Sequence, residues 1–476
     1  MNKLKRNLLI NVSYQLLVVL IPLVVAPYVS RTIGPEGVGI YTYTFNFAYC
    51  FALVGMLGVS NYGNRTIAAV GEDKLLRSRN FWNIWAIQIL MSLAACSAYG
   101  IWCLTAGQDA SGIAWVQLIT VACSLFDISW FFFGIEKFQI TVGRNLVVKL
   151  LNMALIFTLV KGEGDLAVYS LIMVGGNLLN NLLLLPFLKK EIVFVRPTFR
   201  EMKQHIKPMV VLFFPVVAVS IYKIMDKVML GALSTTTQTG FYEYAEKIIS
   251  LPVTLITAVG AVMLPRLSAM LGKNEQSQAM RLTQITMEVM MALTCAMAWG
   301  IFAIAMEFAP AFFGAEFTWS GVVMMGLAPS VICQSWANVI RTQYLIPAKM
   351  DKVYVSSTWI GAVVNLVMNL LLIPRFQALG AALGTLCAEF AVAAYQTVQA
   401  RRGLPVGKYM SAVIYYLVPS GVMVALIRLI ARTSGLEGFG LIAAEVAGGG
   451  LIYCILALPY MYLRFRKLKQ AGAEAE

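Results

Sequence analysis

Charge is scarce in this sequence. Only 13% of its 476 residues are Asp, Glu, Lys or Arg, whereas 59% are hydrophobic. A soluble protein is nearer one quarter charged and one half apolar. Long apolar runs recur along the whole chain, so the composition leaves no room for a sizeable soluble domain and predicts a polytopic membrane protein.

Residues that bind metals or form disulfides are also few. The one histidine, His205, has no expected partner, and the eight cysteines include no C-x-x-C pair. All eight cysteines fall within apolar runs, where they act as small packing residues. The pattern therefore excludes a metal site and a disulfide framework.

A nucleotide-binding loop is missing as well. The nearest match, GLPVGKY at residues 403–409, has one residue too few between its glycines, and Tyr409 stands where Mg²⁺ needs Ser or Thr. This excludes an ATP-driven pump. The remaining energy sources are an H⁺ or Na⁺ gradient, the membrane potential or the gradient of the substrate itself, and no cofactor is expected.

The net charge of +14 is explained by topology. With the N-terminus inside, 28 Lys and Arg residues fall in inside segments and five at outside ends. Short cytoplasmic loops carry such an excess of basic residues. The charge therefore predicts cytoplasmic termini and some attraction to anionic membrane lipids, and it argues against binding to nucleic acid.

Fourteen apolar spans are predicted, and their ends are approximate. The spans lie at about 8–30, 38–61, 81–105, 113–133, 141–160, 166–188, 208–231, 240–264, 283–306, 320–343, 353–373, 378–399, 409–431 and 438–462. The longest inside connection follows the sixth span. It predicts an N-lobe at 1–190, a connector at 191–207, a C-lobe at 208–400, and a final helix pair with a basic tail at 401–476.

Two six-helix lobes of equal orientation would be related by a pseudo-two-fold axis along the membrane normal. The sequence gives weak support for such a repeat. GIYTYTFNFAYCFALVGML at residues 39–57 and GFYEYAEKIISLPVTLITA at residues 240–258 both begin with Gly, an apolar residue, Tyr, a polar residue and Tyr.

The seventh span contains an unusual group of charges. In VSIYKIMDKVMLG, residues 219–231, Lys223, Asp226 and Lys227 have i, i+3, i+4 spacing and share one helix face. A charge near the bilayer centre costs about 2.5–3.5 kcal/mol on insertion scales. Such a group needs partners or water.

The eighth span has the same spacing at Glu243, Glu246 and Lys247, at nearly the same depth from the outer end. One interpretation is a set of ion pairs that joins the two helices. The other is the charged wall of a water-filled cavity that binds an anionic headgroup. The pairs expected are Lys227–Glu243, Asp226–Lys247 and Lys223–Glu246.

Other acids lie within predicted spans. Asp127 and Glu389 are deep, so each is a candidate H⁺ or cation site or a member of a plain buried pair. Glu288 lies near a predicted inner end and is expected to reach the interface by snorkelling.

Three segments carry a family resemblance. FFPVVAVSIYKIMDKVMLGALSTTTQTGFYEYAEKI at 213–248 resembles the central signature of polysaccharide repeat-unit flippases. PYVSRTIGPEGVGIYTYTFNFAYCFALVGMLGVSNYGNR and NLVMNLLLIPRFQALGAALGTLCAEF resemble their N-terminal and third patterns, in the same order. The sequence thus resembles the Wzx-type branch of the MATE-like (MOP) superfamily.

The resemblance implies two lobes around a central cavity in a bacterial cytoplasmic (inner) membrane. It implies transport, by alternating access, of undecaprenyl-diphosphate-linked oligosaccharide from the inner to the outer leaflet, for O-antigen, capsule or exopolysaccharide. No residue would be catalytic, because flipping breaks no covalent bond. A final helix pair resembles the pair that guides the lipid tail in lipid II flippases, and polysaccharide polymerase machinery is a candidate partner.

A diphosphate with an oligosaccharide is charged, bulky and polar, so it does not cross hydrocarbon unaided. Arginine and lysine can replace water around the phosphates. The candidate diphosphate ligands are Arg31, Arg65, Lys223, Lys227 and Lys247. The simpler roles are a turn contact for Arg31 and positive-inside anchoring for Arg65.

Alternative functions stay open at this stage. A lipid II flippase shares the lobes and the chemistry. A MATE-like drug/cation antiporter would need acids in the first lobe, where Asp127 is the only deep one. A glycan polymerase or ligase would need longer outside loops for its chemistry. A major-facilitator sugar carrier would need G-x-x-x-D-R/K-x-G-R-R between spans two and three, which VGEDKLLRSRN does not match.

Overall fold

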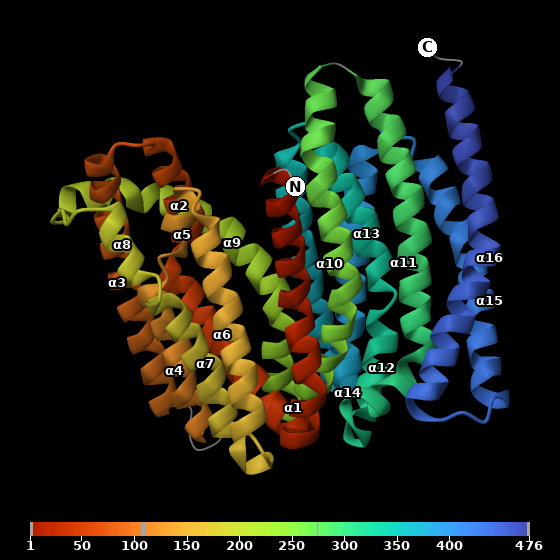
Figure 1. The fold of residues 1–476 in the computed structure, drawn as a ribbon, viewed down its shortest axis with the longest axis horizontal. Helices are drawn as coiled ribbons and strands as arrows, with labels where there is room; N and C mark the ends of the chain where they lie inside the picture. Colours follow the sequence, from red (N-terminus) through yellow and green to blue (C-terminus); the bar gives the residue numbers. More distant parts are fainter. Residues whose placement is uncertain (1–2, 106–110, 274, 474–476) are drawn as a thin grey trace. The chain divides into compact units, whose positions relative to one another are not determined.

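The computed structural model describes residues 3–105, 111–273 and 275–473, and within these ranges it contains helices and no strand (Figure 1). This confirms the predicted all-α class. The chain forms two compact units. The first comprises residues 1–231 with 235–240, and the second comprises residues 232–234 with 241–476.

The first unit contains nine α-helices and one short 3₁₀ helix among the described residues. They are α1 (Lys3–Met56), α2 (Val59–Val70), α3 (Lys74–Thr105), α4 (Ser111–Phe126), α5 (Ser129–Gly134), α6 (Phe138–Leu159), η2 (Glu163–Asp165), α7 (Leu166–Leu182), α8 (Leu185–Glu191) and α9 (Phe199–Leu233). The last residues of α9 belong to the second unit, and the first residues of α10 belong to the first. The seventh predicted span thus packs with the first six in this structure, and the predicted lobe boundaries stay a prediction.

The second unit contains the remaining helices. They are α10 (Thr236–Gly272), α11 (Gln276–Phe313), η3 (Ala315–Phe317), α12 (Thr318–Leu327), α13 (Ser330–Ile340), η4 (Arg341–Leu345), α14 (Asp351–Ala400), α15 (Val406–Thr433) and α16 (Gly438–Ala473). Within this unit, α11 packs against both α15 and α16, which also pack against each other (Figure 1).

Two helices combine two predicted spans each, and each is broken where the sequence predicts a turn. In α1 the break is at Gly34, with φ 72° and ψ 173°. Glycine reaches this conformation without steric cost, and the following Pro35 lacks an N–H to continue the ladder. In α14 the break is at Gln377, with φ 53° and ψ −129°.

Among the described residues, 11 helices are long and apolar enough to cross a membrane, or 12 if the bent pair Ala315–Leu327 and Ser330–Leu345 is one span. Two of the 11 are the broken ranges Leu20–Val70 and Asp351–Ala400. The many apolar helices agree with a polytopic membrane protein. The count of fourteen stays a prediction.

Close helix packing builds the core of the first unit. A Cβ at Gly63 of α2 would lie 2.3 Å from Cε3 of the Trp130 ring in α5, so only glycine allows this approach. The Trp130 indole N–H donates to Gln88 Oε1 over 3.1 Å, which fixes the ring. Phe81 and Phe131 pack around it.

Helix capping explains where α3 begins. Asp73 Oδ1 accepts hydrogen bonds from the backbone N–H groups of Leu75 and Leu76, each over 3.0 Å. These donors have no partner within the helix itself, and aspartate is a preferred N-cap residue. The cap therefore marks the start of α3, after the short turn that follows α2.

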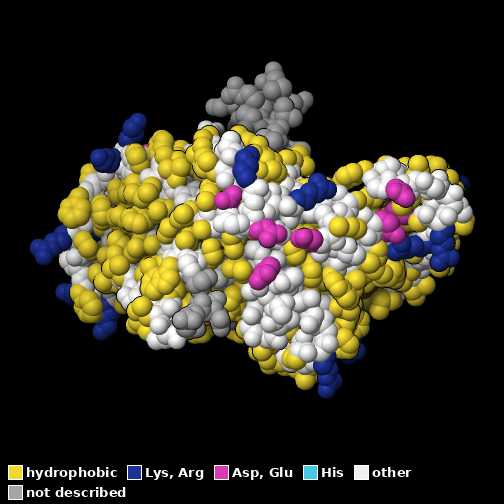
Figure 2. Space-filling model, turned by 90° about the horizontal axis from the view of Figure 1, so that it is seen from below, with side chains coloured by type: hydrophobic (Ala, Val, Ile, Leu, Met, Phe, Trp, Pro, Cys, Tyr) yellow, Lys and Arg dark blue, Asp and Glu magenta, His cyan; other side chains and the backbone are white. Residues whose placement is uncertain are grey.

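Hydrophobic side chains cover much of the exterior. They dominate the face shown in Figure 2, where charged side chains form small separate groups. Leu104, Val262 and Phe390 are examples from the helix surfaces, with 74%, 74% and 65% of their surface exposed. Such a surface is stable in lipid and not in water.

Candidate functional site

A polar cavity of about 360 Å³ lies within the first unit. Helices α1, α4, α7 and α9 and the start of α2 form its walls. Its lining residues are Phe45, Tyr49, Ala52, Leu53, Met56, Gly58, Ser60, Thr120, Cys123, Ser124, Asp127, Asn177, Asn180, Asn181, Val216 and Ser220. Three amides, several hydroxyls and one carboxylate therefore converge on a space that also has an aromatic wall.

Asp127, a predicted ion-coupling residue, is the carboxylate of this polar cavity. It lies at the break between α4 and α5, where its Oδ1 accepts hydrogen bonds from the Ser129 N–H over 3.0 Å and from the Ser129 hydroxyl over 2.5 Å. Asp127 thus caps α5 and also faces the cavity.

The three asparagines come from α7 at i, i+3, i+4 spacing. Asn181 donates from Nδ2 to the Cys123 carbonyl over 3.0 Å, so it also ties α7 to α4. Asn180 Oδ1 is buried and has no hydrogen-bond partner among the described residues. An amide oxygen in this state is available to accept a hydrogen bond from a ligand.

The aromatic wall consists of Phe45 and Tyr49, one turn apart on α1. Their rings stack with centroids 6.2 Å apart and planes 20° apart. Tyr49 keeps 39% of its surface exposed. A flat ring beside amides and hydroxyls suits a ligand that has both an apolar face and many hydroxyl groups.

A second cavity of the first unit, of about 730 Å³, contains two cationic side chains. Its lining residues are Tyr62, Arg65, Thr66, Ala69, Val70, Leu76, Lys207, Pro208, Val211 and Leu212. We name this the basic cavity. Arg65 and Lys207 are exposed, and no acidic residue is among the lining residues, so the cavity favours an anion.

The single histidine, His205, contacts Tyr62, one of the residues that line the basic cavity. Tyr62 OH and His205 Nδ1 lie 2.7 Å apart and link α2 to the first turns of α9. Near this link, Arg79 of α3 forms an ion pair with Glu201 of α9. These contacts hold α9 against α2 and α3, and thereby position Lys207 opposite Arg65. The sequence alone does not predict this partner of His205, because Tyr62 lies 143 residues away in the chain.

Both cavities share α2 and α9. On α9 the basic cavity takes residues 207–212, and the polar cavity takes residues 216 and 220. At 1.5 Å per residue these positions span about 20 Å of one helix. A cationic space and a polar space therefore follow one another along α9.

The three charged residues of the seventh predicted span lie elsewhere on α9. Lys223 is exposed, Asp226 is buried with 5% of its surface accessible, and Lys227 is half-buried. None of the three is among the lining residues of the two cavities. Their predicted role in headgroup binding stays a prediction.

On α10, Lys247 Nζ lies 3.4 Å from Glu243 Oε1, an i, i+4 ion pair within the helix. The same ammonium lies 4.3 Å from the centroid of the buried Tyr244 ring. Lys247 therefore has a charge partner and an aromatic partner on its own helix. The pairs predicted between the seventh and eighth spans stay a prediction.

Two further predicted residues are placed by the structure. Arg31 lies on α1 before the break at Gly34 and is exposed. Glu389 lies on the second part of α14 and is buried, with 8% of its surface accessible. All eight cysteines are free, and no group of three metal-ligating residues occurs among the described residues.

The prediction for Glu288 is wrong. Instead of snorkelling to the interface, Glu288 is buried in α11, with 1% of its surface accessible. Its Oε1 accepts hydrogen bonds from Nε and Nη2 of Arg464 over 2.9 and 2.7 Å. Tyr416 donates to Oε2 over 3.3 Å. The final helix pair supplies these partners, so the carboxylate need not reach water.

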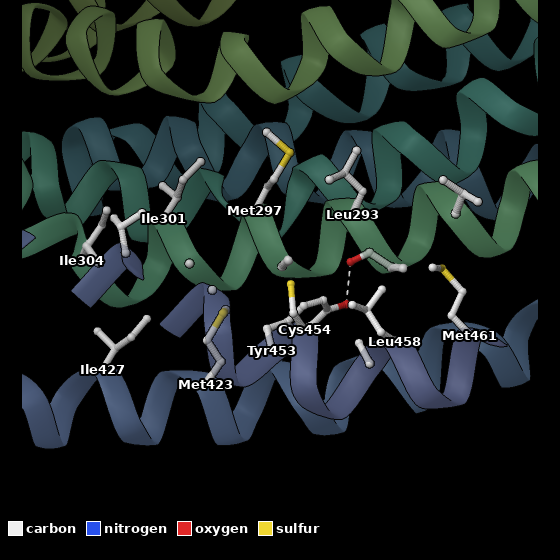
Figure 3. A pocket seen from close by; sticks show the side chains of 17 residues that line it. Leu293, Met297, Ile301, Ile304, Met423, Ile427, Tyr453, Cys454, Leu458 and Met461 are labelled. Carbon is white, nitrogen blue, oxygen red and sulfur yellow. Dashed lines mark hydrogen bonds between the residues drawn. The ribbon is translucent and has the colours of Figure 1, made fainter. Parts of the chain in front are cut away.

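The second unit has an apolar cavity of about 500 Å³ between α11, α15 and α16 (Figure 3). Leu293, Met297 and Ile301 of α11 line it together with Met423 and Ile427 of α15 and with residues of α16. The Tyr453 hydroxyl donates to the Ala292 carbonyl over 2.5 Å and is thereby satisfied. The cavity thus offers a ligand carbon surface and little else.

Sequence reasoning missed Lys207 and the three asparagines. Lys207 is one of the 28 Lys and Arg residues that fall in predicted inside segments, and its position in the sequence does not distinguish it from the others. A signal for the asparagines was present, since Asn177, Asn180 and Asn181 share one helix face within an apolar run. Polar residues on one face of such a run mark either a helix contact or a cavity.

Comparison with known proteins identifies the family. The profile of the family described as "Polysaccharide biosynthesis protein" matches residues 4–271, more than half of the chain. Among curated proteins, the "Probable low-salt glycan biosynthesis flippase Agl15" of Haloferax volcanii is 30% identical over 164 residues, which are 34% of this chain and 34% of that protein. The match thus spans about a third of that relative.

A longer match is to the "Putative O-antigen transporter" of Escherichia coli K12, which is 23% identical over 410 residues, 82% of this chain and 95% of that protein. Both relatives are named for transport, not for catalysis, as the sequence predicts for this chain. Among solved structures, the lipid II flippase MurJ in an inward closed conformation has a TM-score of 0.76 at 14% identity, over 96% of this chain and 98% of that one. This likeness confirms the fold.

Proposed function

We propose that this chain, which belongs to the polysaccharide biosynthesis protein family, flips lipid-linked oligosaccharide across the membrane by alternating access. The cargo would be an undecaprenyl-diphosphate-linked repeat unit for surface polysaccharide, and it would move from the inner to the outer leaflet. The observation that carries the proposal is the succession of a basic cavity and a polar cavity along α2 and α9.

The basic cavity would receive the diphosphate. Arg65 offers a planar fork of donors that matches phosphate oxygens, and Lys207 adds a compact second charge. The predicted topology places the α2–α3 turn and the start of α9 on the cytoplasmic side, where both termini would also lie. Under that topology the headgroup would enter the basic cavity from the cytoplasmic side.

The polar cavity would receive the sugars. Asn177 and Asn180 can donate to and accept from sugar hydroxyls, and Asp127 can accept from them. Tyr49 offers a ring against which an apolar sugar face can rest. The volume of about 360 Å³ accommodates part of a repeat unit and not the whole of it. The site therefore supports recognition of the sugars next to the diphosphate.

The apolar cavity of the second unit would accept part of the isoprenoid tail (Figure 3). Burial of apolar carbon there releases about 25 cal/mol for each Å² removed from water. A tail already in lipid gains less, so this cavity guides the tail more than it binds it.

The other predicted site residues keep their proposed roles. Arg31, Lys223, Lys227 and Lys247 would add positive charge along the headgroup path. Asp127, Asp226, Glu243, Glu246 and Glu389 would balance these charges or couple transport to an H⁺ or Na⁺ gradient. The protein would lie in the inner membrane. It would meet the polysaccharide polymerase machinery there.

A deletion strain tests this function. Loss of the gene should leave lipid-linked oligosaccharide on the inner leaflet and abolish surface polysaccharide, while peptidoglycan synthesis continues. A plasmid copy should restore the polysaccharide, which serves as the control. If peptidoglycan synthesis stops instead, the lipid II alternative replaces this proposal. If only drug resistance changes, the antiporter alternative does.

A further inference from the structure

Three ionisable residues meet near one end of the bundle formed by α11, α15 and α16. They are Glu307 of α11, Arg428 of α15 and Glu445 of α16. Each lies five to seven residues from the end of its helix, or about 10 Å along the axis. Arg428 Nη1 donates to Glu307 Oε1 over 2.6 Å.

Glu445 differs from the other two residues. Its accessible surface is 0%, and neither of its carboxyl oxygens has a hydrogen-bond partner among the described residues. Glu307 Oε2 is also buried and without a hydrogen-bond partner in the same part of the chain. The interface thus contains three carboxyl oxygens that accept no hydrogen bond from the described residues: both oxygens of Glu445 and Oε2 of Glu307.

The charges around Glu445 leave one negative charge in excess. Glu307 from α11 and Arg428 from α15 are the charged groups that act on it, and they form an ion pair with each other. Arg432, one turn further along α15, is exposed. Glu445 is buried, whereas the side chains of Arg428 and Glu307 keep 35% and 25% of their surface exposed. If Glu445 were ionised, the cluster would carry two negative charges against one positive charge. Burial disfavours the charged form of a carboxyl group that no donor stabilises.

We propose that Glu445 is the proton-binding group of the final helix pair. Its carboxyl O–H bond is intact while α16 packs against α11 and α15. When that bond breaks, the proton passes to water and leaves a charge in the interface, which loosens α16. This inference rests on the geometry of α11, α15 and α16 and does not require the proposed function.

A proton fits this site better than a metal cation. A cation would need several oxygen ligands, and the backbone carbonyls here are engaged within helices. No group of three metal-ligating side chains occurs among the described residues. A proton needs only one carboxyl oxygen and leaves the cluster neutral.

If α16 packs less tightly, residues that line the apolar cavity would move with it. Ile304, Ile427 and Val446 line that cavity, and each is within three residues of a member of the cluster. Figure 3 shows Ile304 and Ile427 at the same end of the cavity. Proton release from Glu445 would therefore change the shape of the cavity lining at that end.

Infrared spectroscopy of the purified full chain in lipid tests the proposal without any transport. The wild type at neutral pH should show the C=O stretch of a buried protonated carboxyl group. Glu445→Gln should remove this band. Glu307→Gln should also remove it, because Arg428 then pairs with an ionised Glu445. Glu437→Gln, at an exposed acid in the α15–α16 connection, is the matched control and should keep the band.

A band unchanged in Glu445→Gln overturns the proposal. If that variant does not fold, Arg428→Met decides instead: without the cation both acids should hold protons, so the band should gain intensity, and no gain overturns the proposal. Amide hydrogen exchange gives the second readout. Corrected for intrinsic rates, exchange in α16 should accelerate at alkaline pH in the wild type and not in Glu445→Gln, and equal acceleration in both would contradict the mechanism.

Discussion

Arg65 of α2 and Lys207 of α9 line the same cavity of about 730 Å³, although the chain between them forms six further α-helices. The Tyr62–His205 contact beside them fixes the two helices. Each residue alone fits the pattern of a cytoplasmic anchor. Their convergence places two positive charges in one cavity, on which the proposed binding of the diphosphate rests.

Removal of either cation should weaken headgroup binding. Arg65→Ala or Lys207→Ala is expected to reduce the affinity for the lipid diphosphate by about tenfold, because each loses a charge-assisted hydrogen bond. The measurement is binding of undecaprenyl diphosphate to protein in nanodiscs. Lys203→Ala, at an exposed lysine one turn earlier on α9, is the matched control. An equal loss of affinity in the control would mean that the overall positive charge, and not a specific contact with Arg65 or Lys207, binds the headgroup.

The aromatic wall of the polar cavity should matter for the glycan and not for the lipid. Tyr49→Ala is expected to lower transport of the oligosaccharide-linked lipid by about tenfold, the loss of one aromatic contact. Tyr49→Phe keeps the ring and should retain transport. Flipping rates in proteoliposomes provide the test. Similar rates for Tyr49→Ala and wild type would exclude a sugar contact at this ring.

The close approach of α2 and α5 should be intolerant of one methyl group. Gly63→Ala places a Cβ 2.3 Å from the buried Trp130 ring, and overpacking of this kind costs about 1–3 kcal/mol. Gly143→Ala in α6 meets nothing within 4 Å and is the matched control. Thermal unfolding in one detergent should show a lower Tm for the first variant alone. Equal Tm values would mean that the Trp130 ring moves to accommodate the added methyl group, and would contradict the prediction.

The buried pair of α11 and α16 should depend on both partners. Glu288→Gln removes the charge that satisfies Arg464 and is expected to cost about 2–3 kcal/mol, since Glu288 is buried and Arg464 only partly exposed. Glu288→Met with Arg464→Met leaves no unpaired charge and should recover most of this loss. Thermal unfolding compares the two variants. A double variant less stable than the single one would contradict the argument.

The topology predicts opposite sides for two loops. A cysteine in place of Glu316, in the described 3₁₀ helix η3, should react with an impermeant thiol reagent added outside intact cells. A cysteine in place of Lys203 should react only after lysis. The wild type gives the background from its own cysteines. Outside labelling at residue 203 would reverse the predicted orientation.

The sequence predicts the helical class because the length of an apolar run is a local property. It also predicts the two broken helices, because the turns between adjacent spans are marked by local residues such as Gly34 and Pro35. The repeat suggested by the segments that begin at Gly39 and Gly240 stays a prediction. The structure places these two glycines close together, which the sequence does not predict: a Cβ at Gly39 would lie 3.0 Å from the Gly240 backbone nitrogen. Nor does the sequence predict which distant residues share a cavity. The surroundings of Lys207 and Glu288 come from helices more than a hundred residues away in the chain, so the sequence alone does not show them.

Charge pairing shows the same limit. Spacing predicts a pair between Lys227 and Glu243 of neighbouring spans, and this pair stays a prediction. Within α10, Glu243 forms an ion pair with Lys247, one turn along the helix. An i, i+4 pair costs little entropy to form, so it competes with pairs between helices. Only the packing of the helices decides between them.

The most direct test of the account is a flipping assay with purified protein in vesicles. Fluorescent undecaprenyl-diphosphate-linked oligosaccharide is placed in both leaflets, and a membrane-impermeant glycosidase reports how much is accessible outside. The account predicts that wild-type protein makes nearly all the lipid accessible over time and that Arg65→Ala with Lys207→Ala slows this, while Lys203→Ala does not. Accessibility that stays at the outer-leaflet fraction with wild-type protein, as in protein-free vesicles, would contradict the central claim.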